Sequence, residues 1–286
     1  MLPSYQESPA QLAYRASEAR LAIFKAICAA GKGHIGGAFS CIDVITSVYF
    51  GAGLTFDEGK TKSTAFDRFI LSKGHASLAL YTTLAALGCI ETSELDTVCR
   101  GGARLGEHPD HLTPGVDALS GSLGHGLAIG VGMALAQKMD GSDKKTFVLM
   151  GDGESQEGSV WEAATKAPNL GLGNLVAIID ANNQITLDKT EDMYQVDNFG
   201  AAYQALGWEV LYVDGHNHEA LKRTLMGLSV SSKPKLIVAR TIKGKGVSFM
   251  EGQLKWHHGM PNEHERQIAQ QELVSQVKAL KEAASC

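Results

Sequence analysis

Polar side chains that could bind a metal ion and a phosphate follow two neighbouring strands of the predicted fold. A strand at 146–150 ends in a Gly-Asp-Gly turn centred on Asp152, and a second strand at 175–180 is followed by Asn182. A helix joins two such strands in a right-handed βαβ unit, so their carboxyl ends lie side by side where α/β sheets bind ligands. Carboxylate, amide and carbonyl oxygens suit Mg2+, which leaves further positions to water and phosphate. The pattern therefore predicts a metal-held diphosphate at this edge, with the small Gly153 letting it approach the backbone.

Four histidines lie beside glycine or proline in predicted loops: His34, His75, His108 and His258. Their contexts, KGHIGG, SKGHAS, GEHPD and HHGMP, are tight-turn sequences that can point an imidazole ring into a cleft. Histidine donates to hydroxyl groups when neutral and moves protons near pH 7, so it suits chemistry on sugars. Singly each is more often structural, but the shared context favours one site. Structural roles are expected for His111, His125, His216, His218 and His264, and His257 is the less favoured neighbour of His258.

Two lysines, a glycine-rich helix start and a glutamate complete the candidate site. Lys73 and Lys243 lie beside glycines near presumed strand ends, where they could neutralise a diphosphate or simply be solvated. The segment 121–124 comes before a predicted helix, and its backbone N–H groups suit an anion or a ring nitrogen. Glu157 begins the helix that follows the Gly-Asp-Gly turn, where the helix dipole alone would favour an acid.

Alternating strands and helices must position these residues. The expected strands are 68–72, 146–150, 175–180, 209–213 and 235–241. The expected helices are 9–30, 40–50, one after residue 75, 122–139, one after residue 153 and 263–283, and the expected loops include 31–37 and 101–120. This alternation predicts an α/β fold with a mostly parallel sheet and helices on both faces, in one domain over residues 1–286.

Composition limits the function classes. The chain has 286 residues, of which 44% are hydrophobic, enough for a substantial core. Its net charge is −5 without long runs of one sign, which gives no reason to expect nucleic-acid or membrane binding. The five cysteines are isolated, and the start of the chain has no basic-then-apolar signal. A cytoplasmic location is therefore expected.

The segment GDGESQEGSVWEA, with an asparagine after the next strand, resembles the diphosphate-binding motif of thiamine diphosphate enzymes, and the transketolase family in particular. The four histidine contexts resemble transketolase motifs in the same order along the chain. The resemblance implies thiamine diphosphate and Mg2+ as cofactors. It implies that Asp152 and Asn182 bind Mg2+ through their side chains, and that Gln184 binds it through its backbone carbonyl.

The same resemblance implies roles for the other candidates. His34, His75 and His258 would contact the cofactor or the substrate carbonyl, and His34 and His258 would transfer protons to and from the acceptor aldehyde. His108 would bind the C1 hydroxyl of the donor sugar. Contacts to the cofactor's aminopyrimidine are implied for Gly121 and Leu123. With a diphosphate cofactor, the expected contacts of Lys73, Lys243 and Gly153 to a diphosphate become contacts to the cofactor. Glu157 would lie at a subunit interface, within a proton network between two active sites.

Complete transketolases are about twice this length and continue into a second α/β domain that binds the pyrimidine ring. The resemblance therefore implies a subunit of a split transketolase, which moves a two-carbon ketol unit from a ketose (phosphate) to an aldose (phosphate) together with a second, pyrimidine-binding subunit. An assembly of two such chains with two partners is expected. Two alternatives stay open: a non-catalytic cofactor-binding protein, and a subunit of another split thiamine enzyme, such as a deoxyxylulose-phosphate-synthase-like or 2-oxoacid dehydrogenase-like protein.

Overall fold

The computed structural model describes residues 4–57, 64–184, 199–228 and 231–284. These residues form a five-stranded sheet in the order β1-β2-β3-β5-β4, and every neighbouring pair is parallel. The strands are β1 (Arg68–Leu71), β2 (Thr146–Gly151), β3 (Leu175–Ala181), β4 (Glu209–Asp214) and β5 (Lys235–Arg240). All five predicted strands are confirmed, and each differs from its expected bounds by one residue at the carboxyl end.

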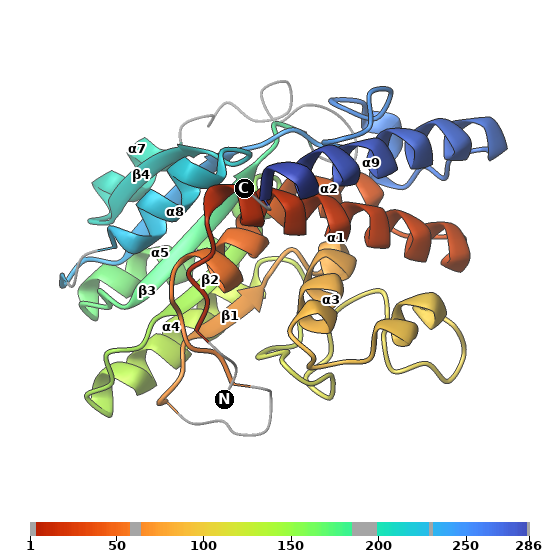
Figure 1. Ribbon diagram of the computed structural model, residues 1–286. Coiled ribbons are helices and arrows are strands. Elements are labelled where there is room, and N and C mark those ends of the chain that lie inside the picture. Colours follow the sequence, from red (N-terminus) through yellow and green to blue (C-terminus); the bar gives the residue numbers. More distant parts are fainter. Residues whose placement is uncertain (1–3, 58–63, 185–198, 229–230, 285–286) are drawn as a thin grey trace.

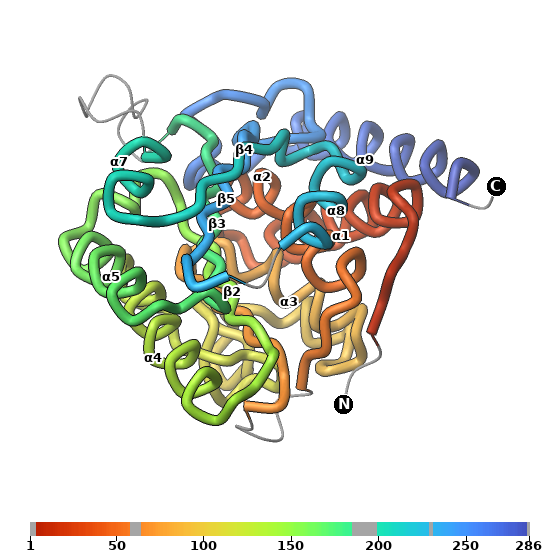
Figure 2. The backbone as a smooth tube through the Cα atoms, turned by 90° about the vertical axis from the view of Figure 1, so that its left-hand side faces the viewer, coloured from red at the N-terminus to blue at the C-terminus, as the bar shows by residue number. Residues whose placement is uncertain are grey.

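Helices cover both faces of the sheet, as predicted (Figures 1 and 2). Successive strand residues alternate between two cores: Phe147 and Leu149 belong to one, whereas Val148 and Met150 belong to the other. The first core is completed by α1 (Pro9–Ala30), α2 (Ile35–Thr46), α3 (Ser77–Ala86), α8 (His218–Met226) and α9 (Glu263–Ala284). The second is completed by α4 (His125–Met139), α5 (Gly158–Asn169) and α7 (Phe199–Ala205). None of the helices in these described ranges is both long and apolar enough to cross a membrane.

The amino-terminal helix begins and ends where its sequence dictates. The hydroxyl of Ser8 accepts from the backbone of Gln11, whose side chain accepts from the Ser8 backbone, so two unpaired helix N–H groups are satisfied together. Gly31 ends the helix in the left-handed conformation, with φ +70°. As expected from its amphipathic sequence, α9 lies on the outside, packed against α1 (Figure 1).

Two predicted helix starts are wrong. The loop expected at 31–37 ends earlier, because α2 begins at Ile35 and continues through Gly36. Glycine is needed there for close approach, since a Cβ at Gly36 would lie 2.8 Å from the backbone oxygen of Trp256. The helix expected from residue 122 begins at His125, because Gly124 has a left-handed φ of +84°. The long loop expected at 101–120 is confirmed, since residues 98–124, all described, form no helix or strand.

Glycine also lets α4 approach the sheet. A Cβ at Gly130 would lie 2.4 Å from the Cγ2 atom of Val148 on β2, whereas a Cβ at Gly132 would meet nothing within 4 Å. Gly130 is therefore a packing residue, and Gly132, on the same helix, has no such constraint.

We expect opposite effects when these two glycines are replaced by alanine. Gly130→Ala should lower the free energy of unfolding by about 1–3 kcal/mol, because the added methyl overpacks the interface between α4 and β2. Gly132→Ala should raise it by up to about 1 kcal/mol, because alanine favours the helix without a steric cost. Urea unfolding of both variants measures the difference, and equal stabilisation by the two changes would contradict the packing argument.

Candidate functional site

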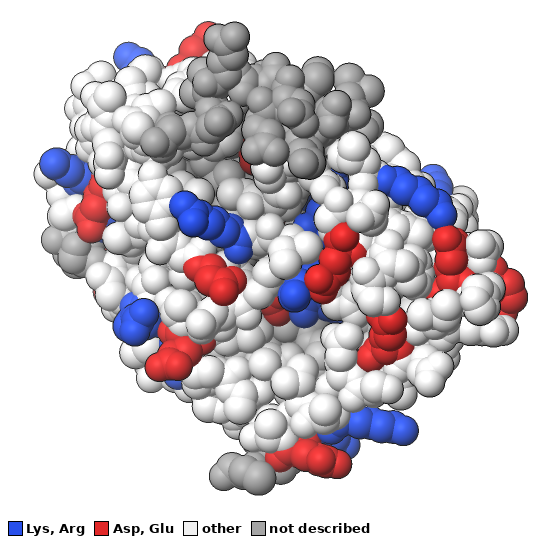
Figure 3. Space-filling view, turned by 90° about the horizontal axis from the view of Figure 1, so that it is seen from above, with Lys and Arg blue, Asp and Glu red and all other residues white. Residues whose placement is uncertain are grey.

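A cavity of about 260 Å3 opens at the carboxyl ends of the central strands. It is lined by Gly37, Lys73, His75, Leu123, Gly151, Asp152, Gly153, Glu154, Glu157, Asn182, Gln184, Lys243 and His257. Seen from above, this end of the molecule has a hollow around which acidic and basic side chains lie close together (Figure 3). The register explains the gathering: Gly151 of β2 pairs with Asp180 of β3, so the residues that follow both strands emerge level with each other.

Most of the candidate residues predicted from the sequence line this cavity, but four lie outside its lining. His34 and His258 adjoin it, since the His34 ring centroid lies 5.2 Å from that of His75 and 4.0 Å from that of His258. His108 lies in the long loop, where its carbonyl accepts from the hydroxyl of Tyr81 at 3.0 Å. Gly121 is exposed. The structure therefore joins the two sets of candidates, oxygen donors at the strand ends and imidazoles beside them, at one location.

A buried carboxylate that the sequence did not single out ties the strand ends together. Asp180, on β3, is fully buried and accepts from Lys73 Nζ, from Thr241 Oγ1 and from Ser40 Oγ at 2.6 Å. Although burial opposes it, Asp180 raises the pKa of Lys73 above its usual value. Lys73 thus carries its charge into the cavity wall with a paired carboxylate behind it. A charged residue ending the apolar run LVAIID was the available signal.

The candidate metal ligands lie together at the ends of β2 and β3. Asp152 is buried, and its carboxylate accepts from the backbone N–H groups of Gly153 at 2.8 Å and Asn183 at 2.6 Å. Burial, with the nearby Asp180, raises the pKa of Asp152 to about 6. The Asn182 side-chain oxygen accepts from the Gln184 backbone at 3.2 Å. These are oxygen donors drawn out of water, which is the setting in which a divalent cation offsets the cost of burying a carboxylate.

Four imidazole rings form a cluster on one side of the cavity: His34, His75, His257 and His258. Burial, followed by the neighbouring His258 and His108, lowers the pKa of His34 to about 4. Burial and then Lys243 lower the pKa of His257 to about 3, and burial also lowers that of His75. The rings of His34, His75 and His257 are therefore neutral at pH 7 and can donate hydrogen bonds. His257, expected to be the less favoured neighbour of His258, lines the cavity and contacts Lys243 Nζ at 2.8 Å, whereas His258 lies just outside the lining.

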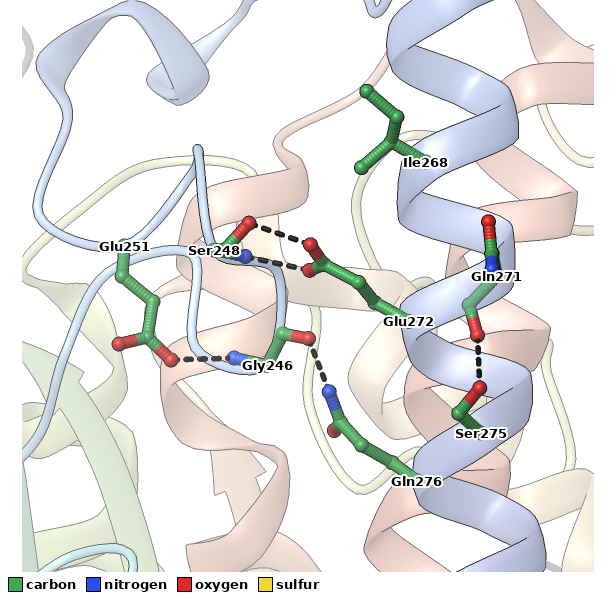
Figure 4. A pocket seen from close by; sticks show the side chains of 8 residues that line it. All are labelled: Gly246, Ser248, Glu251, Ile268, Gln271, Glu272, Ser275 and Gln276. Carbon is green, nitrogen blue, oxygen red and sulfur yellow. Dashed lines mark hydrogen bonds between the residues drawn. The ribbon is translucent and has the colours of Figure 1, made fainter.

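The segment that follows β5 brings Lys243 and two of the histidines to the cavity, and α9 holds that segment in place (Figure 4). Glu272 accepts from the Ser248 backbone at 2.7 Å and from its hydroxyl at 2.5 Å, and Gln276 donates to the Gly246 carbonyl at 2.6 Å. Lys243 Nζ donates to the Gln184 carbonyl at 3.3 Å, and burial lowers the pKa of Lys243 to about 8. Helix α9, on the outside of the fold, therefore supports one wall of the site.

Glu154, which resembles an ordinary helix-start acid in the sequence, is a buried connector. One carboxylate oxygen accepts from Ser72 Oγ at 2.5 Å and from the Gly124 N–H at 2.8 Å, and the other accepts from the Gly151 N–H at 3.1 Å. The backbone N–H groups of 121–124 are expected from the sequence to form an anion site. The N–H of Gly124 instead donates to Glu154. By contrast, Glu157 is exposed at the cavity rim and precedes α5.

A second buried carboxylate explains two of the histidines given structural roles. Asp43, on α2, pairs with Arg20 and contacts His216 Nδ1 at 2.6 Å and His218 Nε2 at 3.1 Å. Burial alone would raise its pKa, but Arg20 and the two histidines hold the pKa of Asp43 well below its usual value. The other His216 nitrogen accepts from the backbone of Ile242 at 2.8 Å. This network supports the segment after β5 from behind.

Two neighbouring glutamates, Glu154 and Glu157, allow a matched test of how much the buried contacts of Glu154 stabilise the protein. Glu154→Gln should lower the free energy of unfolding by about 1–3 kcal/mol, because an amide nitrogen would face a backbone N–H that now has a carboxylate acceptor. Glu157→Gln, at an exposed position, should change it by less than about 0.5 kcal/mol. Urea unfolding at pH 7 compares the two, and a harmless Glu154→Gln change would show that the observed contacts add little stability.

Comparisons with known proteins identify the family. Residues 13–277 match the family model described as "Transketolase, thiamine diphosphate binding domain". The chain is 44% identical over 252 residues to an apulose-4-phosphate transketolase subunit of Phocaeicola vulgatus, covering 88% of this chain and 89% of that protein. It is 37% identical over 254 residues to a 6-deoxy-6-sulfo-D-fructose transketolase subunit of Clostridium sp., covering 88% of this chain and 92% of that protein.

Solved structures agree in fold. The crystal structure of transketolase from Campylobacter jejuni matches with a TM-score of 0.83 at 28% identity, over 96% of this chain and 46% of that one. The chain thus spans less than half of that solved transketolase, and about nine-tenths of the two relatives named as subunits. The resemblance to the thiamine diphosphate-binding subunits of split transketolases, predicted from the sequence, is confirmed, and the chain belongs to the transketolase family.

Proposed function

We propose that this chain is the diphosphate-binding subunit of a split transketolase that uses thiamine diphosphate and Mg2+. The observation that carries the proposal is the cavity at the strand ends, where buried oxygen donors, two lysines and neutral imidazoles converge. The reaction moves a two-carbon ketol unit from a ketose to an aldose. Residues 1–286 act as one domain, and a second subunit supplies the pyrimidine-binding half.

The residues at the strand ends fit a metal-held diphosphate. Asp152, Asn182 and Gln184 would supply oxygen ligands to Mg2+, which prefers oxygen and keeps places for phosphate. The Gln184 side-chain oxygen is buried and has no hydrogen-bond partner among the described residues, as expected of a wall built to meet a further polar group. Lys73, Lys243 and the backbone at Gly153 would face the diphosphate. When bound, thiamine diphosphate supplies the electron sink for breaking and forming the carbon–carbon bond.

The imidazole cluster would handle the sugar. Because His34, His75 and His257 are neutral at pH 7, they serve as hydrogen-bond donors to the carbonyl and hydroxyl oxygens of the substrate. His258 is exposed and its ring lies against that of His34, so this pair would pass a proton between the acceptor oxygen and solvent. His108, from the long loop, would bind the C1 hydroxyl of the donor.

The partner chain would close the exposed rim of the cavity. Leu123, which lines the cavity, is 41% exposed, and Leu119, four residues before it in the same loop, is 53% exposed. Gly121 and Leu123 would meet the aminopyrimidine, and Glu157 would lie at the subunit interface. We propose an assembly of two such chains with two partners, acting in the cytoplasm, where isolated cysteines stay reduced.

Relatives suggest the substrate class. The two subunit-length relatives are named for apulose 4-phosphate and for 6-deoxy-6-sulfo-D-fructose, ketoses with a terminal phosphate or sulfonate. We propose that this enzyme also takes a ketose with an anionic terminal group. Assays with a phosphorylated ketose and with a sulfonated ketose distinguish the two possible terminal groups.

Purification of the chain at its native level, with identification of the protein that accompanies it, tests the proposal. We expect a partner of about 300 residues with a second α/β domain, and the reconstituted pair should transfer ketol units only with thiamine diphosphate and Mg2+. A chain that runs alone and binds the cofactor without turnover would support a non-catalytic binding protein instead. Turnover of a 2-oxoacid in place of a ketose would support another split thiamine enzyme.

In the reconstituted enzyme, Asp152→Asn should weaken Mg2+-dependent binding of thiamine diphosphate by about 100-fold or more, since even groups that only support metal ligands contribute about 10–100-fold. Calorimetric titration of the cofactor at saturating Mg2+ measures the change. Asp143→Asn, which replaces an acid whose side chain is 89% exposed, is the control and should bind normally. Unchanged affinity in Asp152→Asn would remove this residue from the metal site.

His258→Asn should retain cofactor affinity but lower kcat by about 100-fold, because proton transfer by a positioned histidine contributes about 10²–10⁴-fold. His264→Asn, an exposed histidine on α9, serves as the control and should leave kcat unchanged. Steady-state kinetics with cofactor titrations separates the two quantities. If His258→Asn turned over at the normal rate, proton transfer would have to be assigned elsewhere.

A further inference from the structure

We propose that His34, His257 and His258 form a binding site for Zn2+, separate from the oxygen-lined Mg2+ site. One ring nitrogen from each of these histidines lies within 4.8 Å of the others. Their ring centroids are 4.0 Å, 4.7 Å and 5.4 Å apart in the three pairs. Three imidazoles around one point are the ligand set of many zinc sites, which leave a fourth position to water or substrate.

The three rings are held in place by backbone contacts between segments far apart in the sequence. His34 precedes α2, whereas His257 ends a short 3-10 helix, Leu254–His257. The N–H of Gly244 donates to the Gly36 carbonyl at 3.1 Å, and Gly36 lies so close to the backbone of Trp256 that it cannot carry a side chain. The start of α2 and the segment after β5 are thus locked together, and the cluster is pre-positioned.

Ring chemistry favours a transition metal over Mg2+. Zn–N bonds are about 2.0–2.1 Å, so nitrogens now within 4.8 Å must approach one another by up to about 1.5 Å, which small ring rotations provide. His34 Nδ1 is buried without a hydrogen-bond partner in the described part of the chain. Glu107 Oε1 lies 3.5 Å from this nitrogen, where a carboxylate can orient a metal-bound imidazole. Mg2+ prefers oxygen ligands and gains little from such a set.

Lys243 opposes the metal, because its ammonium contacts His257 Nδ1 at 2.8 Å. The remaining surroundings are favourable, since the rings of His34 and His257 are neutral at pH 7, which is the form that binds metal. We therefore expect a Kd for Zn2+ in the micromolar range, weaker than that of a structural zinc site. Metal bound here would occupy the place of the sugar oxygens, so Zn2+ would act as a reversible inhibitor; this consequence alone rests on the proposed function.

Titration of the purified chain with Co2+, followed by displacement with Zn2+, tests the site. Excess Mg2+ is present throughout to fill the oxygen-lined site. We expect one Co2+ per chain with the strong visible absorption of a four-coordinate, nitrogen-rich site. His258→Gln, at an exposed position, and His34→Gln should each weaken Zn2+ binding at least tenfold, whereas His264→Gln should bind as the unchanged chain does. Circular dichroism of each variant reports whether it is folded.

Equal Zn2+ affinity in the folded His258→Gln variant and the unchanged chain would overturn the proposal. A weak Co2+ spectrum typical of six-coordination would also overturn it, and so would loss of binding in Asp152→Asn but not in the histidine variants. Either result would show that the metal is bound by oxygen ligands. In the reconstituted enzyme, Zn2+ should raise the apparent KM for the ketose at least tenfold. Failure of sugar turnover would reject the proposed function but leave the Co2+ and Zn2+ titrations to decide the metal site.

Discussion

The buried carboxylate of Asp180 is the interaction on which the arrangement of the site depends. It accepts from Ser40 on α2, from Lys73 after β1 and from Thr241 after β5. Because a buried charge left without partners costs several kcal/mol, each of these segments is held where it satisfies the carboxylate. Parallel strands place their carboxyl ends at one edge, but this edge alone does not fix where the connecting segments go. Asp180 holds these connecting segments at the edge of the sheet, and candidate residues of the site, such as Lys73 and Lys243, lie within or next to them.

The wall of the cavity that carries Lys243 and His257 is held in place by residues outside the cavity. The segment after β5 is held by the Asp43 network through His216, by the Gly36 carbonyl, and by Glu272 and Gln276 of α9. None of these groups lines the cavity. They nevertheless determine the positions of the imidazole rings and of Lys243. The geometry of the imidazole cluster therefore depends on how the helices pack on one face of the sheet.

Local patterns were sufficient to predict the strands, the helices on both faces, and the convergence of Asp152 with Asn182, because alternation and parallel pairing follow from short-range sequence. They were insufficient wherever two distant segments meet. Residue 36 must be a glycine because Trp256 lies against it, and Glu154 is buried because Ser72, Gly124 and Gly151 surround it. The place of His257 in the cavity depends likewise on how the segment after β5 packs against α2. A single sequence without its tertiary contacts carries no signal for these pairings.

Charge balance distinguishes the two lysines that line the cavity. The charge of Lys73 is already matched by Asp180, and that pairing raises the pKa of Lys73 despite burial. Lys243 instead contacts a carbonyl and an imidazole, and burial lowers its pKa to about 8. An anion beside Lys243 would favour its charged form, so binding would be accompanied by proton uptake near pH 8. Lys243 is therefore the side chain whose charge state would respond to a bound anion, whereas the charge of Lys73 is already held by Asp180.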